Sequence, residues 1–115
     1  YNKLTFEEQI VQTKESIKTV TTQFNLNYNV FSFPYTDDGV SNQFFTVIKN
    51  DVDLTFGSAG LKDDVFKNNF QRIPMENQPN QHLKGISKMG KEIIKTEYFY
   101  YFLKKIVGKN KIIRP

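Results

Sequence analysis

The sequence contains no cysteine and a single histidine, His82. The absence of cysteine excludes disulfide bonds, a thiol nucleophile and any cysteine-ligated metal site. One histidine cannot form a metal site unless carboxylates surround it. The neighbours of His82 include asparagine, glutamine and lysine, so we expect an exposed loop residue there. This chain alone is therefore predicted to bind no catalytic metal.

Long apolar runs are also missing. No stretch approaches the roughly 18 apolar residues of a transmembrane helix, so no membrane span is expected. The chain starts at Tyr1 rather than at methionine, which suggests a piece of a longer protein. No signal peptide is visible, which slightly favours the cytoplasm.

Acidic residues are scarce toward the C-terminus. The whole chain carries 16 basic and 12 acidic residues, a net charge of +4. Residues 84–114 hold nine basic residues against Glu92 and Glu97. A solvated helix face followed by a basic tail is the favoured interpretation, and contact with nucleic acid or an anionic membrane surface is the alternative. No RNA-binding aromatic signature or helix-turn-helix spacing supports specific nucleic-acid binding.

Aromatic residues, in contrast, are abundant, with eleven Phe and six Tyr, which indicates a packed domain rather than a disordered chain. The first predicted element is a helix. Thr5 and Glu8 have the spacing of a capping box, and Asn25 is a plausible stop. Apolar residues recur at helical spacing along one predicted stripe: Phe6, Ile10, Ile17, Val20 and Phe24.

Two short buried strands are predicted next, at residues 28–33 and 52–56. Pro34 cannot continue a central ladder and should end the first of them. A helix capped by Ser41 or Asp38 should connect them.

The rest of the chain reads as a loop and a final helix. Residues 57–84 are loop-like, although FQRIPM at 70–75 could form a third short strand. A long helix is predicted over residues 86–107, with Gly108 capping its end. The aromatic run at 98–107 should pack into the core, with a surface for a second chain as the alternative.

Alternation of helices and short strands predicts parallel β/α units, and hence an α/β fold. Two or three strands make neither a closed barrel nor a full doubly wound sheet. We therefore expect one partial domain over residues 1–115, a partial (β/α) barrel with flanking helices. Ligands of parallel sheets bind at the carboxyl ends of strands, where Pro34, the 55–58 segment and Arg72 are placed.

Residues at these positions resemble one enzyme family. FSFPYTDDGVSNQFF at 31–45 resembles the Pro-Tyr motif of the polysaccharide deacetylases, the NodB-like carbohydrate esterases. Three further segments resemble the elements that flank this motif in the family. They are the helix before it at 4–25, the segment DLTFGSAGL at 53–61 and the segment FQRIPME at 70–76. The resemblance covers about residues 3–76 and identifies the chain with the C-terminal half of the catalytic domain.

The resemblance implies removal of N- or O-acetyl groups from glycans by a distorted (β/α) barrel. It also implies a divalent metal such as zinc in the full-length enzyme, bound by an Asp and two His in motifs that would precede Tyr1. Tyr35 matches the tyrosine whose backbone N–H binds the oxyanion. The substrate-binding residues implied are Pro34, Tyr35, Thr36, Asp37 and Arg72.

The sequence also departs from the family. Ser32 stands where many members have Arg, Thr36 and Asp37 replace the usual Gly, and the late Leu-x-His motif has no match. The fragment is therefore expected to be inactive without the missing N-terminal half of the barrel. Self-association is a further possible partnership, because a partial barrel leaves open sheet edges.

Each candidate residue also has a purely structural interpretation. Asp37 and Asp38 are more typical of helix caps than of a metal site or base. Asp63 and Asp64 are expected to be solvated. Arg72 suits a pocket and a structural ion pair equally. The alternative for the whole chain is a small, basic, aromatic-rich binding or interaction module without enzyme activity.

Overall fold

The computed structural model describes residues 1–73 and 86–115. Three helices and three strands follow one another along the chain. They are α1 (Phe6–Phe24), β1 (Val30–Ser32), α2 (Asn42–Ile48), β2 (Leu54–Gly57), β3 (Asn69–Gln71) and α3 (Ile86–Ile106). His82 and its predicted exposure lie outside the described residues.

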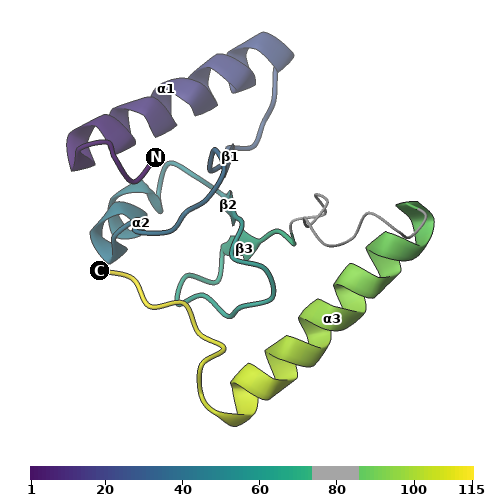
Figure 1. Ribbon diagram of the computed structural model, residues 1–115. Coiled ribbons are helices and arrows are strands. Elements are labelled where there is room, and N and C mark those ends of the chain that lie inside the picture. The colour runs from purple at the N-terminus through teal and green to yellow at the C-terminus, as the bar shows by residue number, and fades with distance from the viewer. Residues whose placement is uncertain (74–85) are drawn as a thin grey trace.

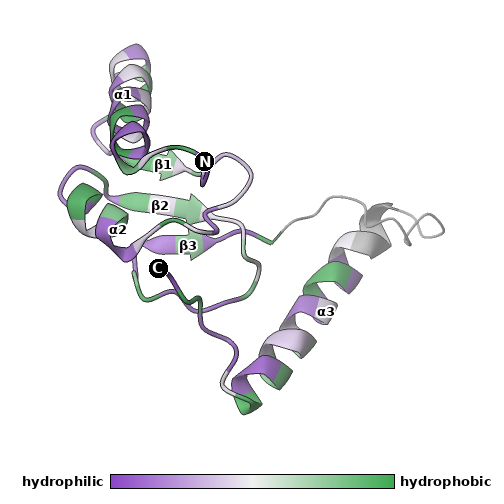
Figure 2. Ribbon diagram, turned by 60° about the vertical axis from the view of Figure 1, so that its left-hand side comes forward, coloured by the Kyte–Doolittle hydropathy of each residue, from purple (hydrophilic) through white to green (hydrophobic). Residues whose placement is uncertain are grey.

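The three strands form one parallel sheet in the order β1-β2-β3. In Figure 2 all three arrows point the same way, so their carboxyl ends share one edge of the sheet. This confirms an α/β class with a parallel sheet and flanking helices. No closed barrel is present among residues 1–73 and 86–115, where the sheet has three strands.

Local sequence signals explain the limits of α1. Thr5 and Glu8 form the predicted capping box, and Asn25 ends the helix with a left-handed backbone at φ 51°. The predicted apolar stripe is only partly correct. Ile17 is buried, but the last turns of the helix are exposed, including Phe24. The buried face of α1 consists of Gln9, Thr13 and Ile17.

The core lies between α1, α2 and the sheet. Phe33, Val40 and Phe44 are almost completely buried, and the Phe33 and Phe44 rings lie 5.8 Å apart between their centroids. Figure 1 shows α1 beside β1 and next to α2, with α3 standing apart from both helices. The remaining buried hydrophobic residues are Ile17, Phe31, Phe45, Ile48 and Val52.

Strand boundaries differ from the prediction by a few residues. The first strand is Val30–Ser32 rather than 28–33, and Phe33 still donates its N–H to the Phe56 carbonyl at 2.9 Å. Pro34 has no N–H to donate, so the ladder ends there as predicted. The third strand suggested by the 70–75 segment is present as Asn69–Gln71.

The final helix is confirmed, but its predicted packing is wrong. Gly108 adopts φ 72°, and the Lys109 N–H donates to the Lys104 carbonyl at 2.7 Å, as in a Schellman cap. The aromatic run at 98–107 does not enter the core. Its large apolar side chains are exposed, and they include Phe99, Phe102 and Ile106.

Candidate functional site

The candidate site is the turn that follows β1 at the carboxyl edge of the sheet. Thr36 donates its N–H to the Pro34 carbonyl at 2.8 Å, and Tyr35 between them has φ 62°. This is a three-residue γ-turn with a positive φ, a rare and strained backbone conformation for a residue with a side chain. The Tyr35 residue is 93 % exposed, so side-chain packing does not stabilise the turn.

Ser58, directly after β2, contacts this turn from the neighbouring strand. Its hydroxyl donates to the Tyr35 carbonyl, and its backbone N–H donates to the Asp37 carboxylate at 3.2 Å. The Tyr35 turn follows β1 and Ser58 follows β2. Because β1 and β2 are parallel neighbours in the sheet, the segments that leave their carboxyl ends meet at the same edge. The contacts tie the two sides of the turn to β2.

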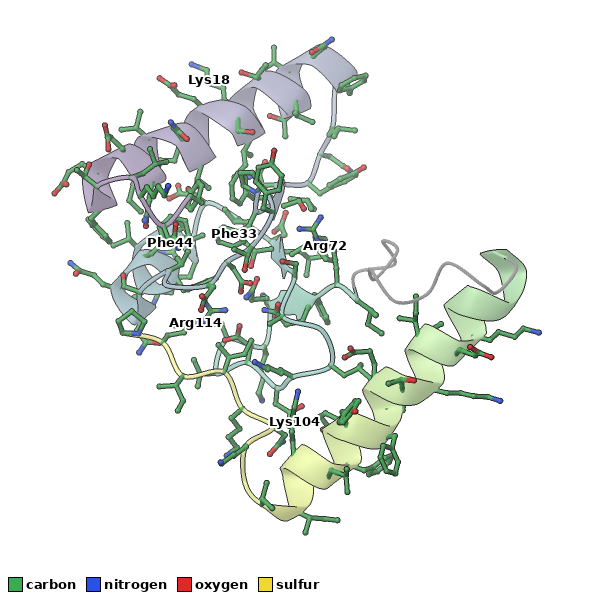
Figure 3. The ribbon with its side chains drawn as sticks, viewed as in Figure 1. Lys18, Phe33, Phe44, Arg72, Lys104 and Arg114 are labelled. Carbon is green, nitrogen blue, oxygen red and sulfur yellow. The ribbon has the colours of Figure 1, made fainter. Side chains whose placement is uncertain are left out.

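Arg72 lies at the same edge of the sheet. Its Nε donates to the Gly57 carbonyl at 2.9 Å, and its Nη2 donates to the Phe33 carbonyl at 2.9 Å (Figure 3). One guanidinium therefore joins the carbonyl of Phe33, directly after β1, to the carbonyl of Gly57, the last residue of β2. The prediction that Arg72 and the Tyr35 turn share one end of the sheet agrees with this geometry.

Behind the turn lies a buried ionic cluster of Asp37, Asp64 and Arg114. Arg114 donates Nη2 to Asp37 Oδ2 at 2.5 Å, and its Nε and Nη2 donate to the Asp64 carboxylate. All three side chains are about 2 % exposed. The Arg114 guanidinium also lies over the Phe45 ring, 4.3 Å from its centroid. The cluster therefore joins the segment after α3 to the body of the protein.

Two amide side chains of β3 complete this cluster. Asn69 Nδ2 donates to both carboxylates, at 2.9 Å to Asp37 and 2.8 Å to Asp64. Gln71 Nε2 donates to Asp37 at 2.8 Å. Asn69 and Gln71 are two residues apart, so they point to the same face of the sheet. That face is polar on β3 because it contacts carboxylates rather than a helix.

The environment lowers the pKa of both carboxyl groups. Burial alone would raise the pKa of Asp37, but hydrogen bonds from Arg114, Gln71 and Asn69 outweigh it and bring the pKa to about 2. The pKa of Asp64 is lowered in the same way, since donation by Arg114, Asn69 and the Phe66 N–H outweighs its burial. Burial would lower the pKa of Arg114, but its two carboxylate partners raise it.

Arg114 has no donor left for a ligand. Its Nη1 group donates to the carbonyls of Asp37 and Val40 at 3.2 and 3.4 Å, so all five N–H groups of the guanidinium are used. Beside it, a hollow of about 250 Å³ is lined by Asp38, Lys62 and Lys111, among others. Arg114 is therefore a structural residue of the site rather than a ligand-binding one.

Several sequence predictions at this site are wrong. Asp37 does not cap α2, because Ser41 accepts the Phe44 N–H at 3.2 Å and occupies the cap position. Asp64 is not solvated, because Arg114 and Asn69 bury its carboxylate.

The other two acidic residues of these pairs, Asp63 and Asp38, are exposed, and each takes part in local hydrogen bonds. The Asp63 residue is exposed as expected, but its carboxylate accepts hydrogen bonds from the Tyr101 hydroxyl and Asn110. Asp38 is also exposed, and its N–H donates to the Thr36 hydroxyl at 3.1 Å, within the turn rather than at the helix cap.

Among residues 1–73 and 86–115, no group of three His, Cys, Asp or Glu side chains is arranged to hold a metal ion. Over the same residues, each helix is too short or too polar to cross a membrane. The chain matches no known family model, no curated protein sequence and no solved structure.

Proposed function

We propose that this chain is the C-terminal part of a metal-dependent glycan deacetylase, with its share of the active site at the Pro34–Tyr35 turn. One observation carries the proposal: a strained, exposed turn lies at the carboxyl edge of a parallel sheet, where such folds bind ligands. Strain of this kind clusters at functional sites. The resemblance of residues 31–45 to the Pro-Tyr motif supplies the reaction class.

In this proposal the Tyr35 backbone N–H binds the oxygen of the tetrahedral intermediate. The Thr36 N–H already donates to the Pro34 carbonyl. The proposal therefore takes the Tyr35 N–H as the donor of this turn. A well-placed donor of this kind contributes a factor of about 10²–10³ in rate. Its effect depends on fixed geometry, because the donor must point to where negative charge develops.

Two residues keep that geometry fixed. Ser58 contacts the Tyr35 carbonyl, and Arg72 joins the strand ends on which the turn is built. Arg72 therefore has a positioning role in the proposal, through backbone carbonyls. Pro34 and Thr36 keep their proposed role in glycan binding. Asp37 is a less suitable glycan ligand, because its carboxylate is buried against Arg114.

The proposed reaction also needs a divalent metal, which when bound polarises the acetyl carbonyl and activates water. The described residues do not fit a metal site. The proposal assigns the metal ligands to the other half of the barrel and derives no step through them from this chain.

The test uses the longest protein that the gene encodes, incubated with zinc and acetylated chito-oligosaccharides or acetylated xylan. Release of acetate is the expected result. Pro34→Gly should lower kcat by about tenfold or more by loosening the amide, whereas Tyr35→Phe, which keeps the backbone donor, should retain most of the activity. Absence of acetate release from every substrate, or an unchanged kcat in Pro34→Gly, would contradict the proposal.

The second candidate is a non-enzymatic binding module, and the exposed aromatic surface of α3 favours it. This surface carries Phe99, Phe102 and Ile106 on α3, which stands apart from α1 and α2. A binding module would keep its ligand after Pro34→Gly and lose it when these side chains are changed.

A further inference from the structure

One face of α3 presents apolar side chains to solvent. Phe99, Phe102 and Ile106 are 62, 59 and 81 % exposed. They are spaced by three and four residues, so they lie on the same side of the helix together with Leu103. We call these four residues the α3 stripe. A soluble protein seldom leaves such a contiguous apolar surface uncovered unless something binds it.

The opposite face of α3 is directed toward the body of the protein. Tyr101 donates its hydroxyl to the Asp63 carboxylate at 3.1 Å, and the Glu97 carboxylate lies beside Gly60. Lys104, on the same side, is half-buried. The α3 stripe is therefore on the side that points away from the sheet. Figure 2 shows α3 well separated from α1 and α2, with green segments along its length.

The segment after the helix fixes this orientation. The Asp63 N–H donates to the Asn110 carbonyl and the Ile112 N–H to the Asp63 carbonyl, both at 2.9 Å. Arg114 is then anchored in the buried carboxylate cluster. The end of α3 is thus held on both sides of Gly108, and the stripe is presented outward.

The surroundings of the α3 stripe are positively charged. Residues 98–115 contain no Asp or Glu. Lys105, Lys109 and Lys111 are exposed there, and Lys91 and Lys95 are exposed along the preceding turns. The carboxylates of Asp63 and Glu97 face the body instead. Glu92, seven residues before Phe99, is an exposed acidic residue among these five lysines. An apolar stripe bordered by lysines is complementary to a surface that is apolar inside and anionic outside.

We propose that the α3 stripe docks onto an anionic membrane surface, with its phenylalanines among the acyl chains and its lysines at the headgroups. Interfacial helices combine aromatic and aliphatic side chains on one face with lysines beside them. Tyr98 and Tyr100, both exposed, border the stripe at the position that tyrosine favours at such interfaces. The docking does not depend on the proposed deacetylase function.

A second copy of this chain fits the stripe less well. Pairing two stripes would bring two sets of lysines together, and like charges at close range oppose association. Anionic lipid reverses the sign of that interaction, since each lysine near the surface adds attraction.

The test measures sedimentation of the 115-residue chain with vesicles of phosphatidylcholine, with or without phosphatidylglycerol. Binding should require phosphatidylglycerol and weaken as salt is added. The double variant Phe99→Ser/Phe102→Ser should lower the partition coefficient by about tenfold or more. Phe24→Ser is the matched control, because Phe24 on α1 is 64 % exposed and lies outside the stripe.

Lysine variants test the charge separately. Lys105→Gln/Lys109→Gln should lower binding by roughly fivefold for each lysine, whereas Lys18→Gln, on exposed α1, should leave it unchanged. Circular dichroism checks that every variant keeps its helix content. Equal binding to vesicles lacking phosphatidylglycerol, or no loss in the phenylalanine variant, would overturn the proposal. A stripe-dependent dimer mass in light scattering, without vesicle binding, would also overturn it in favour of a second copy.

Discussion

Asp37 and Arg114 form a buried ion pair of 2.5 Å between residues that lie 77 positions apart in the sequence. A second carboxylate, that of Asp64, shares the same guanidinium. The cluster thus has two acids for one base, and the amides of Asn69 and Gln71 supply the remaining donors. Stability of this region depends on Arg114 more than on any single acid.

Replacing Arg114 should be strongly destabilising. Arg114→Ala leaves two carboxylates buried without their cation, which costs about 3–5 kcal/mol in the free energy of unfolding. The control is Lys14→Ala, which breaks the exposed pair between Lys14 and Asp51, 3.1 Å apart. It should cost less than about 1 kcal/mol. Urea denaturation measures both, and similar losses in the two variants would contradict a buried role for Arg114.

Acid should unfold the protein through the same cluster. The pKa of Asp37 is about 2 in the folded state, below its ordinary value of 3.8. Its contribution, on the order of 2 kcal/mol, is present above pH 3.8 and is lost as the pH falls toward 2. The lowered pKa of Asp64 acts in the same direction. Thermal melts between pH 5 and 2 test this. At pH 5 Asp37→Asn should be less stable than the unsubstituted protein, and it should lose less stability as the pH falls. The same pH dependence in both proteins would contradict the assignment to Asp37.

Gly57 should tolerate no side chain. A Cβ atom at this position would overlap the Asp37 carboxylate, which is fixed by its hydrogen bonds. We expect Gly57→Ala to cost about 1–3 kcal/mol. Gly108→Ala is the comparison, because φ is 72° there and no atom lies within 4 Å of the added Cβ. Backbone strain alone should cost it about 1 kcal/mol, and a smaller loss at Gly57 than at Gly108 would contradict the close packing.

Tyr35→Gly should stabilise the chain. Tyr35 has φ 62° and an exposed side chain, so glycine removes the strain and loses no packing. The gain should be about 0.5–1 kcal/mol after the greater freedom of glycine in the unfolded chain is subtracted. Thr36→Gly, the neighbouring control, should instead destabilise. A lower melting temperature for Tyr35→Gly would show that the turn is not strained.

Arg72→Lys should loosen the turn although it keeps the charge. Lysine lacks the fork that donates to both Phe33 and Gly57. Losing these bonds should cost about 1–3 kcal/mol locally. Amide hydrogen exchange of Thr36 reports on the turn, and its rate should rise at least about fivefold. An unchanged exchange rate would mean that Arg72 does not brace the turn.

Local signals made much of the fold predictable. The capping box at Thr5, the stop at Asn25 and the glycine cap at Gly108 each depend on a few neighbouring residues, and each is present. Pro34 ends β1 for the same local reason. The third strand was harder to predict, because Asn69 and Gln71 are polar where a buried strand is expected to be apolar.

The ionic cluster could not be predicted because its members are far apart in the sequence. Asp37 and Asp64 look like turn residues, and Arg114 looks like one more cation of a basic tail. Only the chain path that returns after α3 brings them together. The one available signal was Arg114 itself, which follows two isoleucines and precedes proline. The exposure of the 98–107 run was missed because its pattern is equally typical of a core helix.

The distance in sequence between Asp37 and Arg114 also imposes an order on folding. During synthesis α1, α2 and all three strands leave the ribosome before Arg114 is made. Until then Asp37 and Asp64 repel each other across the amides of Asn69 and Gln71. Closing so long a loop is slow compared with forming helices. We therefore expect the polar face of β3 to become stable only after Arg114 has been synthesised.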